Sequence, residues 1–245
     1  MNKKIKILKN KIKKYGVDGY IVPKNDEFFS EYAAVDRLKV ISNFNGSAGI
    51  AIILQKKNYL FVDGRYTIQA KQQSGKNFEI IEIHKYLPKK IIKNLVLGYD
   101  PSLFTKFQIK YYFGKSIKLK PIEKNLIDEI YVNKKIKPNI IFSLNNKIVG
   151  EDTISKVNKI KKILKINKAD YLFISAPENV AWAMNIRGWD NPNSPISNCR
   201  LIIGAKGKTY LITKKIKAAK IIKEKKLKSQ QVIEPEKFFE LIGNL

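Results

Sequence analysis

The sequence predicts an α/β protein built from two similar halves, of which the second is shorter. Three observations support this fold class. Helical and strand patterns alternate along the chain, and the order of elements in the first half recurs from about residue 152 onward. The chain has 245 residues with 44% hydrophobic content, enough to bury a substantial core. No segment approaches the roughly 18 consecutive apolar residues that a membrane span needs.

The first half opens with an amphipathic helix over about residues 3–15, whose apolar residues fall three or four apart and which ends at Gly16. A buried strand at 18–23 and a long polar loop follow. Two strands separated by the short polar stretch QKKN then predict a hairpin. We expect its strands at 48–54 and 58–63, followed by a helix at 66–73, a strand at 78–83, a helix at 87–95, a strand at 95–100, a helix at 104–113, a strand at 116–123 and a closing helix at 124–133.

The second half follows the same plan. A helix over about 152–166 carries Ile154, Val157, Ile160 and Leu164 at helical spacing, which predicts one buried face. The remaining elements are expected as a strand at 169–175, a hairpin over 199–213, a helix at 215–227, a strand at 230–234 and a helix at 236–242.

The first half continues for about fifty residues beyond the equivalent of the last helix of the second half. If the halves share a fold, the second lacks its final strands and exposes an unpaired sheet edge. The joint between them is expected near 138–148, where Pro138 precedes a polar stretch. We therefore predict domains at 1–140 and 146–245, with the second incomplete at its carboxyl end.

The formal net charge of +27 raises the possibility of nucleic-acid binding. Only four of the 48 cationic residues are arginine, however, and the lysines are spread along the whole chain. Phosphate and base recognition favours the planar guanidinium group of arginine. The accompanying abundance of Ile, Asn, Tyr and Phe fits an AT-rich coding bias, so we expect no specific nucleic-acid partner.

The residues that could support metal or covalent chemistry are few. One histidine, His84, and one cysteine, Cys199, cannot form a Cys/His zinc cluster or an internal disulfide. His84 and Glu82 alternate with Ile81 and Ile83, which predicts a solvated strand face. We expect no metal ligands and no catalytic residue in this chain, and the lone cysteine favours a reducing cytoplasm.

The turn DGRY, residues 63–66, is the strongest candidate for binding. Asp63 can cap the helix that follows and Gly64 permits a tight turn, whereas a turn has no need of the guanidinium of Arg65. The aromatic and acidic loop before it offers Tyr32 and Arg37 as weaker candidates. Arg187, beside Trp189 and Asp190, occupies a similar loop in the second half.

Four stretches together resemble the N-terminal region of the cytosolic, three-domain Xaa-Pro aminopeptidases, relatives of prolidase and creatinase. They are IVPKNDEFFSEY, ISNFNGSAGIAII, DGRYTIQAKQQ and ENVAWAMNIRGWDNPNSPI, and they occur in the order of that family. The resemblance covers nearly the whole chain. It implies two tandem creatinase N-terminal-like lobes with mixed sheets flanked by helices, the second apparently truncated.

The resemblance also implies a function. In this family a third, pita-bread domain binds two divalent ions, usually manganese, and hydrolyses the bond before a proline in second position. That domain is absent from these 245 residues, so we expect the chain to be inactive alone. The family role that carries over is that of Arg65, which approaches the substrate, with Asp63, Gly64 and Tyr66 shaping its turn. A homodimer is also expected of the family.

Two further readings remain open at this point. The chain could be a stand-alone, non-catalytic module that binds a peptide or a protein through its two lobes. It could also be a basic nucleic-acid-binding protein, for which the charge is the sole support.

Overall fold

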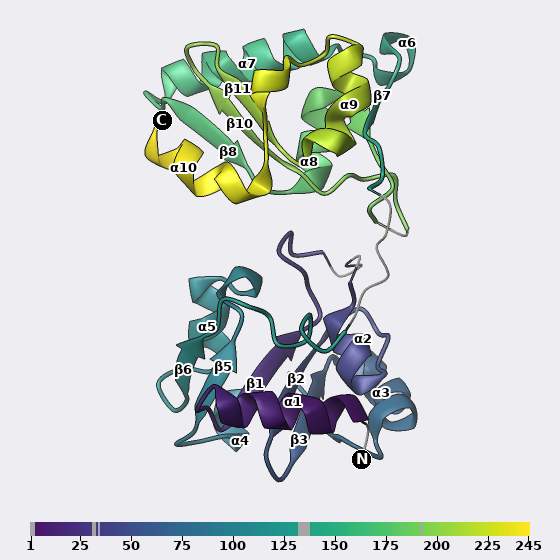
Figure 1. The fold of residues 1–245 in the computed structure, drawn as a ribbon, viewed down its shortest axis with the longest axis vertical. Helices are drawn as coiled ribbons and strands as arrows, with labels where there is room; N and C mark the ends of the chain where they lie inside the picture. The colour runs from purple at the N-terminus through teal and green to yellow at the C-terminus, as the bar shows by residue number, and fades with distance from the viewer. Residues whose placement is uncertain (1–2, 31–32, 34, 132–137, 192) are drawn as a thin grey trace. The chain divides into compact units, whose positions relative to one another are not determined.

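The computed structural model describes residues 3–30, 33, 35–131, 138–191 and 193–245, and it divides the chain into two compact units (Figure 1). Unit 1 is Met1–Lys135 and unit 2 is Ile136–Leu245. The division lies beside the stretch 138–148, in which the sequence predicts the joint. In the part of the chain that the structure describes, no helix is long and apolar enough to cross a membrane.

Unit 1 contains a six-stranded mixed sheet in the order β4-β3-β2-β1-β5-β6. Strand β2 runs antiparallel to both of its neighbours, and the other adjacent pairs are parallel. This confirms the predicted α/β class and the predicted hairpin between β2 and β3. The strands are β1 (Gly19–Pro23), β2 (Gly49–Leu54), β3 (Asn58–Val62), β4 (Glu79–Glu82), β5 (Val96–Tyr99) and β6 (Lys118–Pro121).

Apolar side chains cover both faces of this sheet. One cluster joins helix α1 (Lys3–Lys14), through Ile5, Leu8 and Ile12, to sheet residues that include Tyr20. The opposite cluster includes Ile21 and residues around helix α5. The other helical segments of unit 1 are α2 (Arg37–Ser42), η1 (Gly64–Tyr66), α3 (Thr67–Ser74), α4 (Pro88–Ile91), η2 (Pro101–Leu103) and α5 (Lys106–Tyr112).

Three expectations for unit 1 are wrong. The polar loop before β2 contains helix α2, which begins after the N-cap Asp36 and ends at Asn43 in a left-handed conformation. The predicted helix at 124–133 is a series of turns over its described residues, because the backbone bonds from Ile130 and Tyr131 both return to Ile127. The helix predicted at 87–95 is limited to α4.

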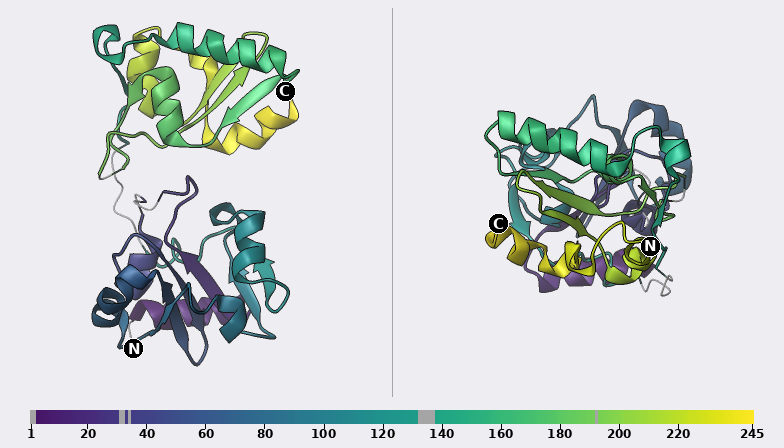
Figure 2. Two further views of the ribbon diagram at one scale, coloured as in Figure 1. Left: turned by 180° about the vertical axis from the view of Figure 1, so that it is seen from behind. Right: turned by 90° about the horizontal axis from the view of Figure 1, so that it is seen from above.

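Unit 2 repeats part of this plan. A four-stranded sheet has the order β12-β11-β10-β8, and β7 (Phe142–Ser143) pairs separately with β9 (Ile186–Arg187). The other elements are α6 (Asn146–Val149), α7 (Thr153–Ile166), β8 (Tyr171–Ile174), α8 (Pro177–Met184), β10 (Arg200–Gly204), β11 (Thr209–Ile212), α9 (Lys215–Lys223), η3 (Ser229–Gln231), β12 (Val232–Ile233), η4 (Pro235–Lys237) and α10 (Phe238–Gly243). Helices α7 and α10 lie on opposite sides of the sheet in all three views (Figures 1 and 2).

The predicted hairpin of unit 2 is confirmed by the antiparallel pair β10–β11. Helix α8 was not expected. The predicted buried face of α7 is wrong at Ile154, which is 73% exposed, whereas Val157 and Leu164 are buried. Residue 154 lies in the first turn of the helix, where Thr153 instead turns inward and donates a hydrogen bond to the carbonyl of Met184.

Candidate functional site

The carboxyl ends of the parallel strands of unit 1 meet at one edge of the sheet. Strand β1 leads there to Lys24, β3 to Asp63 and β4 to Ile83. In open α/β sheets, ligands bind in the crevice outside these strand ends. A cavity of about 280 Å³ lies at this edge, with apolar walls that include Phe29 and Phe104. We therefore take this edge as the candidate site.

The DGRY turn forms one side of the edge. Asp63 is the N-cap of η1, and its Oδ1 atom accepts hydrogen bonds from the Arg65 backbone nitrogen at 3.0 Å and from Arg65 Nε at 2.8 Å. His84 Nε2 lies 3.3 Å from Asp63 Oδ2. The hydrogen bond from the Arg65 side chain, and then that from its backbone, lower the pKa of Asp63 below its usual range. The carboxylate is therefore ionised and fixes the start of the Arg65 side chain.

The Arg65 side chain is held at its Nε atom by Asp63, while its guanidinium group is exposed to solvent. Its side chain is 72% exposed, and its Cζ atom lies 5.4 Å from the centre of the Tyr66 ring. A guanidinium carries five donors in a planar fork that suits carboxylate and carbonyl oxygens. The arrangement can present a cation to a polar group of a ligand.

Tyr66 and Gly64 hold the turn against the rest of unit 1. The Tyr66 hydroxyl lies 2.9 Å from Ser47 Oγ, and the Tyr66 ring packs edge-on against Phe44. A Cβ atom at Gly64 would come within 3.3 Å of Glu82 Oε1, at the end of β4. Glycine therefore allows the turn to lie close to the neighbouring strand.

The loop that precedes α2 reaches the same cavity. Asp26 is buried and accepts hydrogen bonds from the backbone nitrogens of Phe28 and Ser30, and burial raises its pKa above the usual value. Between them Phe29 has a φ of 59°, which is unusual for a bulky residue, and it lines the cavity. The loop thus places an aromatic ring at the candidate site.

Arg37, a weaker candidate, has structural partners. Its Nε and Nη2 atoms each donate to Asp128 at 2.8 Å, and Glu27 lies 3.5 Å away. Its side chain is 13% exposed. Burial lowers the pKa of Arg37, but the hydrogen bonds and charge of Asp128 raise it by more. Arg37 therefore ties α2 to the turns after β6, while Tyr32 lies outside the described residues.

Arg187 and its neighbours lie in unit 2. Arg187 Nη1 donates to the carbonyl oxygens of Ala181, at 3.1 Å, and Ile186, at 2.8 Å. Asp190 accepts from Ser197 Oγ at 2.9 Å, and Trp189 is 60% exposed. Arg187 thus ties its strand to α8, Asp190 is engaged in structural contacts, and Trp189 is presented to solvent.

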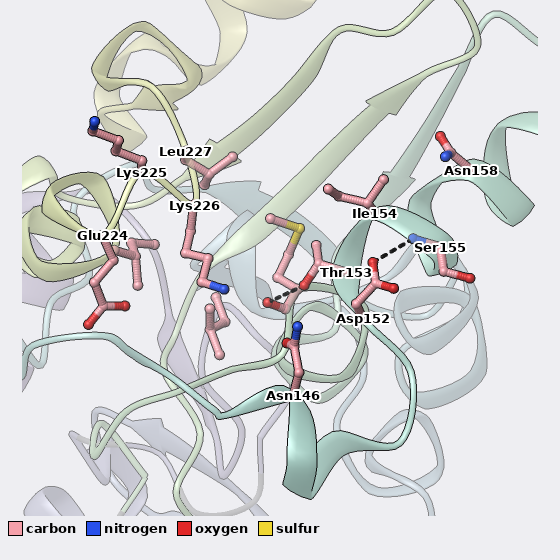
Figure 3. A pocket seen from close by; sticks show the side chains of 13 residues that line it. Asn146, Asp152, Thr153, Ile154, Ser155, Asn158, Glu224, Lys225, Lys226 and Leu227 are labelled. Carbon is pink, nitrogen blue, oxygen red and sulfur yellow. Dashed lines mark hydrogen bonds between the residues drawn. The ribbon is translucent and has the colours of Figure 1, made fainter.

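A second cavity, of about 700 Å³, lies in unit 2 between the start of α7 and the turn after α9 (Figure 3). Its lining is engaged in local contacts: Asp152 Oδ1 accepts from the Ser155 nitrogen at 2.9 Å, and Glu224 accepts from Ser143 Oγ at 2.5 Å. The floor is formed by core residues such as Met184. None of the residues that the sequence singles out for binding lines it.

Within the described ranges, no group of three or more His, Cys, Asp or Glu side chains could hold a metal ion. The donor set therefore does not fit a di-metal centre. Cys199 is fully buried, and burial raises its pKa to about 12, which leaves no reactive thiolate at neutral pH.

Some residues of the site were not singled out from the sequence. Phe29 belongs to the aromatic and acidic loop, but its left-handed backbone has no sequence signal. Ser47 lies in the stretch ISNFNGSAGIAII, and its contact with Tyr66 spans 19 residues. Asp128 was placed on a predicted helix, so its pairing with Arg37, 91 residues away, was missed.

Comparison with known proteins yields matches over the whole length of the chain. The profile of the creatinase/prolidase N-terminal domain matches residues 4–129, and a second profile of the same description matches residues 132–245. A probable Xaa-Pro aminopeptidase P of Coprinopsis cinerea is 32% identical over 211 residues, which are 80% of this chain and 34% of that protein. Xaa-Pro aminopeptidase 1 of Dictyostelium discoideum is 32% identical over 222 residues, 80% of this chain and 35% of its own length.

A solved structure shows the same fold. The crystal structure of X-prolyl aminopeptidase from Caenorhabditis elegans, described as a cytosolic enzyme with a di-nuclear active site, matches with a TM-score of 0.84. The match has 23% identity and covers 98% of this chain and 43% of that one. The chain spans about a third of the length of the curated relatives it matches.

Proposed function

Because the chain belongs to the creatinase/prolidase N-terminal domain family, we propose that it forms the substrate-positioning part of a Xaa-Pro aminopeptidase, a metallopeptidase that removes an N-terminal residue preceding proline. The similarity to the N-terminal region of such enzymes extends over 80% of the chain. We propose that its two units position the substrate within the enzyme.

The observation that carries this proposal is the geometry of Arg65. The side chain is solvent-exposed, yet Asp63 fixes its Nε atom and its backbone nitrogen. Pre-organisation of this kind reduces the conformational entropy lost when a side chain binds a ligand. A peptide offers carbonyl oxygens and a terminal carboxylate, which both accept hydrogen bonds from a guanidinium, the carboxylate more strongly. Arg65 would thus contact a peptide that carries proline in second position.

The hydrolytic step is proposed to lie elsewhere in the longer enzyme. The described residues do not fit a di-metal centre, so two divalent ions, expected to be manganese, would belong to a separate catalytic domain. We therefore propose that this chain alone hydrolyses no peptide. We also propose a cytoplasmic location, which the similarity to an enzyme described as cytosolic supports, and a homodimer for the longer protein.

The test uses the 245-residue chain labelled with ¹⁵N and titrated with the tripeptide Ala-Pro-Ala. We expect amide shifts that centre on residues 63–66. The Arg65→Gln variant should bind roughly tenfold more weakly, since a hydrogen bond to a charged group contributes about 1.5–3 kcal/mol. In parallel, incubation with manganese and Ala-Pro-Ala should release no alanine.

Lys85→Gln is the matched control, because Lys85 is a comparably exposed cation near the same strand end. It should bind as the unchanged protein does. Shifts that map away from the DGRY turn, or unchanged affinity of the Arg65→Gln variant, would contradict the role of Arg65. Equal affinity for Ala-Ala-Ala would contradict a preference for proline in second position. Release of alanine would contradict the placement of the catalytic step.

A further inference from the structure

The cavity beside the DGRY turn has apolar walls from segments of unit 1 that lie far apart in the sequence. Phe29 comes from the loop before α2, Ile50 from β2 and Ile83 from the end of β4, while Phe104 follows η2 and Tyr112 ends α5. The volume of about 280 Å³ is below the range of about 300–1,000 Å³ that is usual for pockets enclosing a whole drug-sized ligand. The cavity therefore has the size for one side chain rather than for a complete peptide.

Two of the wall rings are fixed by contacts outside the cavity. Asn25 Nδ2 donates a hydrogen bond to the carbonyl oxygen of Leu103 at 2.9 Å, which ties the loop of Phe29 to the segment that carries Phe104. The Phe104 ring packs edge-on against Phe113 and is 8% exposed, whereas Phe29 is 47% exposed. The cavity thus exists before a ligand binds, and the exposed part of the Phe29 ring can pack against a guest.

The polar groups in the lining already have partners. The Lys24 ammonium donates to Asp36, and the Ser47 hydroxyl lies 2.9 Å from the Tyr66 hydroxyl. Both carboxylate oxygens of Asp63 have partners as well, in the DGRY turn and just after β4. A polar side chain in the cavity would lose its water and would have to compete with these bonds, whereas an apolar side chain gains from burial alone. The lining therefore favours an apolar guest.

The charge at the rim indicates which part of a peptide lies here. Asp63 and His84 both line the cavity, and the Arg65 side chain begins its exposed part at its bond to Asp63. A guanidinium repels the ammonium group of a peptide's amino terminus and donates hydrogen bonds to carbonyl and carboxylate oxygens. The amino terminus must therefore lie away from Arg65, and the residue after the proline lies nearest to it.

The covalent structure of a short peptide then brings its third side chain to the cavity. In a tripeptide, the terminal carboxylate and the third side chain are attached to the same Cα atom. A carboxylate bound to Arg65 consequently places that side chain within reach of the cavity beside Asp63.

We propose that this cavity is a specificity subsite for an apolar side chain at the third position of a peptide with proline in second position. Phe29 is the specificity-determining residue, since its ring is the exposed wall of the cavity. The inference rests on the proposed function, because it takes Arg65 as the group that binds the carboxyl part of the peptide. It adds the class of substrate: peptides whose third residue is leucine, isoleucine, methionine or phenylalanine.

The first test compares two tripeptides on the full 245-residue chain. Ala-Pro-Leu and Ala-Pro-Asn have third side chains of nearly equal size, but only the leucine is apolar. We expect Ala-Pro-Leu to bind roughly tenfold more tightly, because burial of a leucine side chain is favourable. Isotope-filtered NMR spectra should show nuclear Overhauser effects from the leucine methyl groups to the rings of Phe29 and Phe104.

The second test replaces the exposed wall. Phe29→Asn removes the ring and keeps the backbone, because asparagine tolerates the left-handed conformation that Phe29 adopts. The ratio of the two affinities should fall below about threefold, and the affinity for Ala-Pro-Asn should stay within about twofold. Phe107→Asn is the matched control, since Phe107 is a 74% exposed ring of α5 outside the cavity lining, and it should keep the ratio of the unchanged protein. Retained dispersion of the amide spectrum shows that both variants are folded.

Arg65→Gln separates this inference from the proposed function. It should weaken the binding of both tripeptides by the same factor, because the guanidinium and the cavity bind different groups of the peptide. Weaker binding by Arg65→Gln together with equal affinities for the two tripeptides would overturn the subsite and keep the proposed function. A preference for leucine without any effect of Arg65→Gln would support the subsite and contradict the role of Arg65.

Two further outcomes would overturn the inference. One is a ratio of affinities that is the same in Phe29→Asn as in the unchanged protein. The other is a loss, in that variant, of the preference for Ala-Pro-Ala over Ala-Ala-Ala while the third residue has no effect. That result would assign the cavity to the proline ring.

Discussion

At the scale of single residues, Asp190 collects several donors around one carboxylate. Oδ2 accepts from Ser197 Oγ at 2.9 Å, from the Asn198 backbone nitrogen at 2.7 Å and from the ammonium of Lys217. Both charged side chains are largely buried, at 13% and 11% exposed. From the sequence, Asp190 was placed beside Arg187 in a loop with a possible recognition role. Its pairing with Lys217 was missed, because the lysine lies 27 positions away.

We expect Asp190→Asn to lower the free energy of unfolding by about 3 kcal/mol, because removing one partner of a buried pair leaves the other charge uncompensated. Urea denaturation followed by circular dichroism measures this change. Glu79→Gln is the control, since the ion pair of Glu79 with Lys57 is exposed and its loss should leave stability unchanged. Equal losses in the free energy of unfolding would show that the Asp190–Lys217 pair stabilises the protein no more than the exposed pair does.

Cys199 makes a pH-dependent contribution that can be isolated. Burial raises its pKa from 9.0 to about 12. The folded state therefore holds the thiol proton more tightly than the unfolded state, so the contribution is complete below pH 9 and is lost as the pH rises toward 12. Relative to Cys199→Ala, the free energy of unfolding of the unchanged protein should fall by up to about 1.4 kcal/mol per pH unit above pH 9.

Urea titrations at pH 8, 9 and 10 on both proteins provide the measurement, and the lysine titrations cancel in the difference. At pH 8 the native thiol should also react with a disulfide reagent roughly a thousandfold more slowly than in urea, from the lower thiolate fraction alone. A constant difference between the two proteins from pH 8 to pH 10 would contradict the buried-thiol account.

The candidate site illustrates which residues a sequence reveals. The DGRY turn was predictable because three of its four residues have a local reason: Asp63 is a cap, Gly64 permits the turn and Arg65 is a cation that the turn does not need. The ring of Phe29 and the hydroxyl of Ser47 meet this turn only through the sheet. No spacing in the sequence encodes that meeting, so the cavity itself could not be predicted.

At the scale of elements, the predicted helix over 152–166 tests how periodicity assigns burial. Leu164 is buried in the core of unit 2, while Ile154 at the start of the same helix is exposed. We expect Leu164→Ala to destabilise the protein by about 2–5 kcal/mol, because it leaves a cavity. Ile154→Ala should change the free energy of unfolding by less than about 0.5 kcal/mol.

Thermal or urea unfolding of the two alanine variants tests whether Ile154 is buried, as the periodicity predicts, or exposed, as in the structure. Equal losses at both positions would mean that Ile154 is packed as the simple periodicity predicted. A negligible loss at Leu164 would mean that α7 is not held through this face.

The missed elements have physical reasons as well. Helix α2 is six residues long, too short for its period to stand out from the polar loop around it. The stretch 124–133 has helical spacing, but Leu126 and Ile127 pack against α1 and Tyr20 in the core of unit 1. Tertiary contacts override the local preference, and turns replace the helix over the described residues 124–131.

At the scale of the whole molecule, the two-part organisation was the most predictable feature. The two hairpins follow from the alternation of strand patterns with short polar turns. The incompleteness of the second domain stays a prediction. The order of the strands within each sheet and their pairing register required the structure, because periodicity along the chain does not say which strands are neighbours.

The contact between Tyr20 and Gly98 restrains how the first unit can diverge. A Cβ atom at position 98 would lie 2.6 Å from Ile122 and 3.2 Å from the Tyr20 ring. A side chain at position 98 therefore has room only if the residues at positions 20 and 122 move away or become smaller. Replacement of this glycine would thus require compensating replacements at two positions that lie far from it in the sequence.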